Sequence, residues 1–197
     1  LGAATGSAFV TDLATGAGHV TVAPWDFSRV NPQTFSRIRL AVEQGSRLRI
    51  EYRSMRTPEP HARTVDPHSL IQAGRRWHMR GYCLETSDFR DFVLGRIAKI
   101  TVLDQRSEHT VTDDSKWNAV VKVRIQAHPK LTPGQQDLVR SEYFDGTAVR
   151  VHSCRGAMLP YLVQELRLAL DTTKEMPPEY QLAVENVKEV RKWLFPA

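Results

Sequence analysis

Residues 76–83 could bind an anion, because basic and aromatic side chains alternate there with apolar ones. His78 and Arg80 point to one side of an extended chain, and Trp77 and Met79 point to the other. A period of two is that of a β-strand with one apolar and one polar face. A guanidinium group forms a rigid fork for phosphate or carboxylate. The pattern therefore predicts an anion-binding strand, although the solvated outer face of a half-buried sheet would have the same pattern.

A second run, residues 89–97, extends this chemistry. Arg90 and Arg96 lie on either side of Phe92 and Leu94 in a segment that also alternates. Aromatic side chains such as Trp77 and Phe92 are more often core residues than stacking surfaces. We therefore expect the arginines, rather than these rings, to contact a ligand.

The distribution of charge favours the same region. The formal net charge is +5, and residues 46–106 contain twelve basic and seven acidic residues, which accounts for the whole excess. Residues 1–45 and 107–197 are each neutral. Lys99 is the only lysine among those twelve basic residues. Such a bias suggests an anionic partner, although an arginine-rich genome would produce it as well.

Motifs for catalysis or metal binding are not found. The sequence has no HExxH, no Cys/His pairs at zinc spacing, no glycine-rich phosphate loop and no Gly-x-Ser-x-Gly. Asp113 and Asp114 have no partner at a useful spacing and are better interpreted as a helix or turn cap. His61 and His68 could ligate a metal, but their spacing matches no known motif. We expect neither an enzyme nor a cofactor.

The length of 197 residues suits one large or two small domains. No apolar run is long enough to cross a membrane. Cys83 and Cys154 lie in strand-like runs, so we expect buried, reduced thiols and a cytoplasmic protein. The start at Leu1 has no initiator Met and no basic segment, which suggests a piece of a longer chain rather than a signal peptide.

Periodicity predicts the secondary structure. Residues 1–23 form either a tether or a loose strand pair, and Asn31-Pro32 begins a helix that Gly45 ends. Short strands then suggest a small barrel, at residues 47–54, 61–65, 69–73, 91–94 and 97–103. The C-terminal part alternates strands at 120–125, 147–153 and 180–184 with helices at 132–143, 158–170 and 186–194.

Four segments together resemble a WYL domain: Ile50-Glu51-Tyr52-Arg53-Ser54, Asp66-Pro67-His68, and the runs 76–83 and 89–97. The namesake tripeptide is Trp77-His78-Met79 here, which departs from the family at its last two positions. The histidine, with Pro-His before it and Arg-Asp-Phe after it, is most similar to WYL repressors found beside bacterial anti-phage systems of the BREX and CBASS types. The resemblance is specific over residues 48–97 and weaker elsewhere.

The resemblance implies an α+β fold with three parts. Residues 1–45 would be a linker and helix, residues 46–106 a WYL domain with an Sm-like, SH3-type β-barrel, and residues 107–197 a small α/β dimerisation domain of the WCX type. Family members carry a winged helix-turn-helix before the WYL domain. Nothing in this sequence matches that motif, so we expect it to be missing here and the chain alone not to bind duplex DNA specifically.

The resemblance also implies a shared ligand pocket on the barrel, formed by Tyr52, Ser54, His68, His78, Arg80, Arg90 and Arg96. Tyr52 and Ser54 would donate hydrogen bonds, and the arginines would bind phosphate. Two alternatives stay open. Tyr52 could be a core residue with its hydroxyl at the rim, and Arg96 could pair with Asp91 or Asp104.

The expected function is that of the ligand-sensing and dimerising region of a bacterial transcriptional repressor at a phage-defence locus. Its ligand would be nucleic acid or a nucleotide-like anion, and duplex DNA would bind through the missing N-terminal domain. We expect a homodimer and no membrane partner. The alternative is an RNA- or single-strand-binding module of the Sm/SH3 type with no regulatory role.

Overall fold

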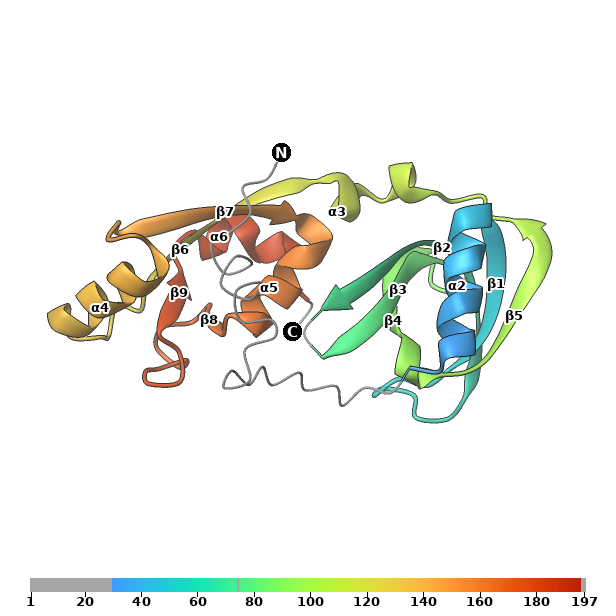
Figure 1. Ribbon diagram of the computed structural model, residues 1–197, viewed down its shortest axis with the longest axis horizontal. Helices are drawn as coiled ribbons and strands as arrows, with labels where there is room; N and C mark the ends of the chain where they lie inside the picture. The colour runs from blue at the N-terminus through green and yellow to red at the C-terminus, as the bar shows by residue number, and fades with distance from the viewer. Residues whose placement is uncertain (1–29, 74, 196–197) are drawn as a thin grey trace, which may run out of the picture.

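The structure is a computed structural model that describes residues 30–73 and 75–195 (Figure 1). The prediction for residues 1–23 lies outside this range. Two mostly antiparallel sheets lie side by side along the long axis of the molecule, each with its own helices. The expected α+β class is therefore confirmed. None of the helices in the described ranges is long and apolar enough to cross a membrane.

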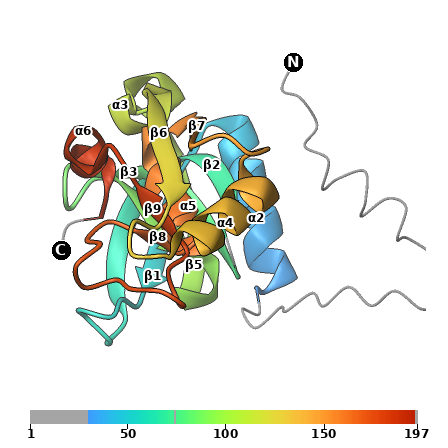
Figure 2. The same ribbon diagram turned by 90° about the vertical axis from the view of Figure 1, so that its left-hand side faces the viewer.

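The first described helix, α2 (Pro32–Gln44), begins where its capping residue predicts. The Asn31 side chain accepts hydrogen bonds from the backbone N–H groups of Gln33 and Thr34, and Pro32 occupies the first helical position. Gly45 ends the helix in the left-handed conformation, with φ of 62°. One face of α2 is buried against β1, β2 and β5, as Figures 1 and 2 show.

The first sheet has five antiparallel strands in the order β4-β3-β2-β1-β5. They are β1 (Ser46–Tyr52), β2 (His61–Ala73), β3 (Arg76–Cys83), β4 (Asp88–Val93) and β5 (Ile97–Arg106), with the 3-10 turn η1 (Leu94–Arg96) joining the last two. Within the described residues, β4 and β5 each pair with a strand on one side only. These strands do not close into a barrel, and the Sm-like, SH3-type character predicted for this region stays a prediction.

The break predicted between two strands at Asp66-Pro67-His68 is wrong, because β2 runs through it as one strand. A register shift between Pro67 and Ser69 accommodates the proline as a bulge. Gly81 on β3 lies opposite Pro67, where the absence of a side chain lets the two backbones approach closely.

The second sheet has the order β7-β6-β9-β8, with β8 and β9 parallel. Its strands are β6 (Val120–Ala127), β7 (Val149–Arg155), β8 (Leu168–Ala169) and β9 (Leu182–Val184). The helices are α3 (Ser115–Asn118), α4 (Pro133–Tyr143), α5 (Leu159–Glu165) and α6 (Val187–Val190), with the 3-10 turns η2 (Val111–Asp113), η3 (Gly156–Met158) and η4 (Arg191–Trp193).

Two C-terminal helices are shorter than predicted. The helix expected over 158–170 ends at Glu165, because Arg167 adopts a positive φ of 46° and the chain continues as β8. The helix expected over 186–194 divides into α6 and η4. Pro160 does lie in the first turn of α5, as predicted.

Each sheet has a separate apolar core. The first is made of residues between Ile38 and Ile100, and the second of residues between Val121 and Val190. Phe92 belongs to the first core and Trp77 is partly buried against it, as expected from their types. The predicted domain limits at 45/46 and 106/107 stay predictions, and α2 packs into the first core.

Candidate functional site

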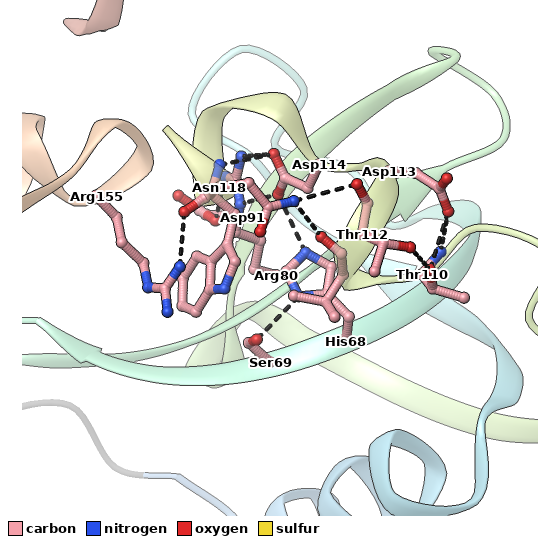
Figure 3. Close-up of polar contacts among 12 residues, drawn as sticks. His68, Ser69, Arg80, Asp91, Thr110, Thr112, Asp113, Asp114, Asn118 and Arg155 are labelled. Carbon is pink, nitrogen blue, oxygen red and sulfur yellow. Dashed lines mark hydrogen bonds and ion pairs between the residues drawn. The ribbon is translucent and has the colours of Figure 1, made fainter. Parts of the chain in front are cut away.

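His78 and Arg80 lie on the same side of β3, as the alternation predicts, but that side is not a solvated surface. Their side chains are 6% and 4% exposed. Arg80 pairs in register with Asp91 on β4, and His78 pairs with Val93. The face packs against residues of the C-terminal half, so a polar junction joins the two halves of the molecule (Figure 3).

Arg80 is the centre of this junction. Its Nε and Nη2 atoms donate to the two carboxylate oxygens of Asp114, at 2.5 and 3.1 Å, and Nη1 donates to Asp91 at 2.9 Å. Burial would raise the pKa of Asp114, but hydrogen bonds from Arg80 and from the Trp117 N–H more than offset it and the pKa is lowered. The guanidinium group predicted to bind phosphate is therefore held by two carboxylates of the protein itself.

Asp114 also connects His68 and α3 to the junction. Its carboxylate caps α3 by accepting the Trp117 N–H at 3.1 Å, which confirms the predicted cap. His68 contacts the same carboxylate through Nε2 at 3.1 Å and the Ser69 hydroxyl through Nδ1 at 2.8 Å. Burial lowers the pKa of His68, and Asp114 opposes this only in part.

Tyr161 on α5 closes the other side of the junction. Its hydroxyl donates to Asp91 at 2.8 Å, and its ring lies 5.1 Å from that of His78. Burial and the Asp91 charge raise the pKa of Tyr161. The Nδ1 atom of His78 is buried and has no hydrogen-bond partner among the described residues. Burial lowers the pKa of His78, Asp91 and the nearby backbone of Arg76 oppose this, and the charges of Arg76 and Arg96 lower it further. The Arg76 backbone lies near the ring but does not reach Nδ1 with hydrogen-bond geometry.

Of the other residues predicted to bind the ligand, Tyr52 lies beside the junction and Ser54 lies away from it. Tyr52 is a core residue whose hydroxyl accepts the Val93 N–H at 3.2 Å, next to His78. The Ser54 hydroxyl accepts the Thr57 N–H at 2.9 Å and so shapes the loop after β1. The structure thus supports the core alternative for Tyr52.

Arg96 and Arg90 are not equivalent. Arg96 ends η1, is half-buried and lies close enough to lower the pKa of His78, and no ion pair within the described ranges includes it. Asp91, one of its two suggested partners, binds Arg80 instead. Arg90 pairs in register with Gly81, on the face of β3 opposite to His78, and donates to Thr86. The structure therefore does not bring Arg90 into a pocket with His78.

A second buried ion pair, missed by the sequence analysis, holds the segment between the two sheets. Asp66 is fully buried and accepts hydrogen bonds from Arg47 Nε at 2.7 Å and from the backbone and ring of His109 at 3.1 Å. The His109 ring stacks on Tyr82 with centroids 3.6 Å apart. The only sign of this ion pair in the sequence was that Asp66 lies in one of the segments that resemble a WYL domain.

We expect the stability of the protein to fall as the pH is lowered through about 6.5, because burial lowers the pKa values of His68 and His78 in the folded state. Below the ordinary histidine pKa of about 6.5, the unfolded chain takes up protons that the folded chain excludes. The free energy of unfolding therefore keeps its full value above this pH and declines below it. Asp66 and Asp114 have lowered pKa values and contribute to the loss only at more acidic pH.

Urea denaturation of the wild type and of His78→Phe on both sides of this pH measures the effect. The variant should show a flatter dependence on pH, since one of the two buried histidines is gone. An identical slope in both proteins would mean that His78 titrates alike in the folded and unfolded chains.

Comparisons with known proteins decide the family. A family model described as WYL domain matches residues 33–102. The chain contains a WYL domain. A second model, described as BrxR transcriptional regulator, C-terminal dimerization domain, matches residues 120–190 of this WYL-domain chain. The resemblance predicted most specifically over residues 48–97 is thereby confirmed.

Curated relatives agree with these matches. The chain is 33% identical over 174 residues to the DNA-binding transcriptional repressor CapW of Escherichia coli (strain KTE188), covering 87% of this chain and 57% of the relative. It is 34% identical over 164 residues to CapW of Pseudomonas aeruginosa, covering 83% and 54%. This WYL-domain chain therefore spans little more than half the length of these relatives.

Solved structures show only a distant likeness. The proteasome accessory factor B/C (PafBC) of Arthrobacter aurescens matches with a TM-score of 0.40 and 20% identity, over 84% of this chain and 27% of that one. A CRISPR Cas-related protein matches with a TM-score of 0.38 and 10% identity, over 81% and 50%. Neither score is high enough to support a statement about the fold.

Proposed function

We propose that this WYL-domain chain is the ligand-sensing and dimerising region of a bacterial transcriptional repressor. The observation that carries the proposal is the similarity to curated CapW repressors over more than four-fifths of the chain. Duplex DNA would bind through a further domain of the whole protein, and the regulated genes would be a phage-defence locus. The finer assignments, an Sm-like barrel over 46–106 and a WCX-like domain over 107–197, belong to the same proposal.

The ligand site is proposed at His78 and Arg96, with Arg76 beside them. Arg76 is exposed and Arg96 half-buried, and the charges of both act on His78. His78 has a buried ring nitrogen with no partner among the described residues, and a ligand atom would satisfy it. Two arginines beside one neutral imidazole suit a phosphate or carboxylate group. The ligand class is therefore an anion of the nucleotide or nucleic-acid type.

Arg80 has a different part in this proposal. It transmits ligand binding rather than contacting the ligand, because its N–H groups already bind Asp91 and Asp114. An anion beside His78 would compete with Asp91 for positive charge and so change the Arg80 contacts to the C-terminal half. A ligand shifts a conformational equilibrium only when its affinity differs between the two states, and this competition supplies such a difference.

Titration of labelled oligothymidylate and of single nucleotides, followed by fluorescence anisotropy, tests the site. We expect Arg96→Ala to weaken binding by about 10- to 100-fold, as loss of a charge-assisted hydrogen bond does. Arg90→Ala is the matched control, since it removes the same charge from the opposite face of β3. Affinity for a phosphate-containing ligand should also fall steeply with salt.

Two outcomes would count against the proposal. Equal losses for Arg96→Ala and Arg90→Ala would indicate general electrostatic attraction rather than a site. Absence of binding by any nucleotide or oligonucleotide at low salt would exclude nucleic-acid-type ligands and leave a small non-nucleotide anion.

A further inference from the structure

Strand β7 forms one edge of the second sheet. It pairs with β6 through seven consecutive residues without a register shift, from Val149 opposite Gln126 to Arg155 opposite Val120. In the sheet order β7 is the outermost strand, and no other strand of the described residues pairs with its free side. Alternate residues of this seven-residue strand therefore present free backbone donors and acceptors along the outer edge.

The side chains of this edge are accessible to a partner. Residues 150–153 are all exposed, Val151 is 54% exposed, and Val120 at the end of β6 is 73% exposed. Isolated edge strands are usually blunted by proline, lysine or a bulge, because an open edge pairs with other strands. β7 has none of these three features, and its two charged residues, Arg150 and Arg155, lie near its ends.

The sequence of β7 is complementary to itself in one antiparallel register. If two copies pair about a two-fold axis at His152, all seven residues find a partner. Val151 then lies opposite Ser153, and Arg150 lies opposite Cys154. No arginine faces another arginine. The smallest shift that keeps every side chain on its own face of the sheet is two residues, and it would leave two residues of each seven-residue strand without a partner.

We propose that two copies of this chain join through antiparallel pairing of their β7 strands, centred on His152. The two four-stranded sheets then form one continuous sheet across the dimer. A second copy is the occupant because residues 120–190, which include all of β7, match a model described as a dimerization domain. The inference rests on the dimerising role in the proposed function and assigns the surface that performs it.

Site-directed cross-linking tests the register. In a Cys154→Ser background, His152→Cys places two cysteines opposite each other across the axis, with Cα atoms about 4.5–5.5 Å apart. A disulfide spans Cα distances of about 4.4–6.8 Å, so mild oxidation should give a covalent dimer on a non-reducing gel. Arg150→Cys in the same background is the control. Its two copies lie four residues apart along the strands, roughly 14 Å, and should stay uncoupled.

A second variant tests the edge without cysteine chemistry. Val151→Lys adds a charge to an exposed position of β7, so folding should be preserved, as circular dichroism can check. We expect sedimentation equilibrium to show a dimer dissociation constant at least ten times that of the wild type.

The possible results distinguish the pairing of β7 strands from the more general proposal that the chain dimerises. A wild-type dimer that His152→Cys does not cross-link and Val151→Lys does not weaken would overturn the β7 pairing and leave dimerisation standing. A monomeric wild type at every concentration would overturn both. The anion titrations described above are independent of either result.

Discussion

Replacing Arg80 with alanine should lower the free energy of unfolding by about 3–5 kcal/mol, the range for breaking a buried ion pair on one side. The substitution leaves the carboxylates of Asp91 and Asp114 facing a cavity, with neither solvent nor an opposite charge to stabilise them. Asp114 is almost completely buried, and its oxygens make two of the three Arg80 hydrogen bonds. Because these carboxylates come from different halves of the chain, the loss should affect the whole molecule.

Urea denaturation gives this free energy, with Arg90→Ala as the control. Arg90 is 52% exposed and its nearest carboxylate, Asp88, is 3.9 Å away. Such a surface pair contributes at most about 1 kcal/mol. A double variant, Arg80→Met with Asp114→Leu, should lose less than the sum of the two single changes, because no uncompensated charge stays buried. Similar losses for Arg80→Ala and Arg90→Ala would contradict the junction described here.

Gly81→Ala should cost about 1–3 kcal/mol or more, although it adds a single methyl group. A Cβ atom at Gly81 would lie 2.5 Å from the carbonyl oxygen of Asp66 and 2.8 Å from the Cα atom of Pro67. Both are backbone atoms of the β2 bulge, so neither can move aside as a flexible side chain can. The carboxylate of Asp66, held by Arg47, would shift with its backbone.

The melting temperatures of Gly81→Ala and Gly134→Ala test this prediction. They compare a glycine whose added methyl group would meet backbone atoms with one whose added methyl group has free space. A Cβ atom at Gly134, in the first turn of α4, would meet nothing within 4 Å. That substitution should be neutral or stabilise the protein by about 0.4–1 kcal/mol through the entropy of the unfolded chain. Equal melting temperatures for the two variants would mean that β2 adapts to the added methyl group.

Local signals in the sequence predicted the elements well where one short segment determines the structure. Asn31 and Pro32 mark the start of α2, and Thr132 and Pro133 mark the start of α4, because caps act on backbone groups only a few residues away. Residues 76–83 form a strand with the predicted division of faces. β2 was divided in error because proline usually ends a strand, and the compensating Gly81 lies fourteen residues further along the chain.

The partners of the candidate site could not be predicted, because they depend on contacts between distant segments. Alternation places Arg80 and Met79 on opposite faces of the same strand. It does not show whether the Arg80 face is covered by another part of the chain or by water. Asp114 follows Arg80 by 34 residues and Tyr161 follows Asp91 by 70. No spacing rule connects residues so far apart. Arg80 was therefore interpreted as a ligand contact, whereas its charge is used within the protein.

Hydrogen–deuterium exchange with and without saturating oligothymidylate most directly tests whether binding at His78 and Arg96 is transmitted through Arg80. Our account predicts altered exchange in β3, and also at residues 114–118, which contact the ligand only through the Arg80–Asp114 pair. Arg96→Ala, which weakens binding, should remove both changes at the same ligand concentration. Changes confined to β3, with residues 114–118 exchanging as in the free protein, would contradict transmission through this junction.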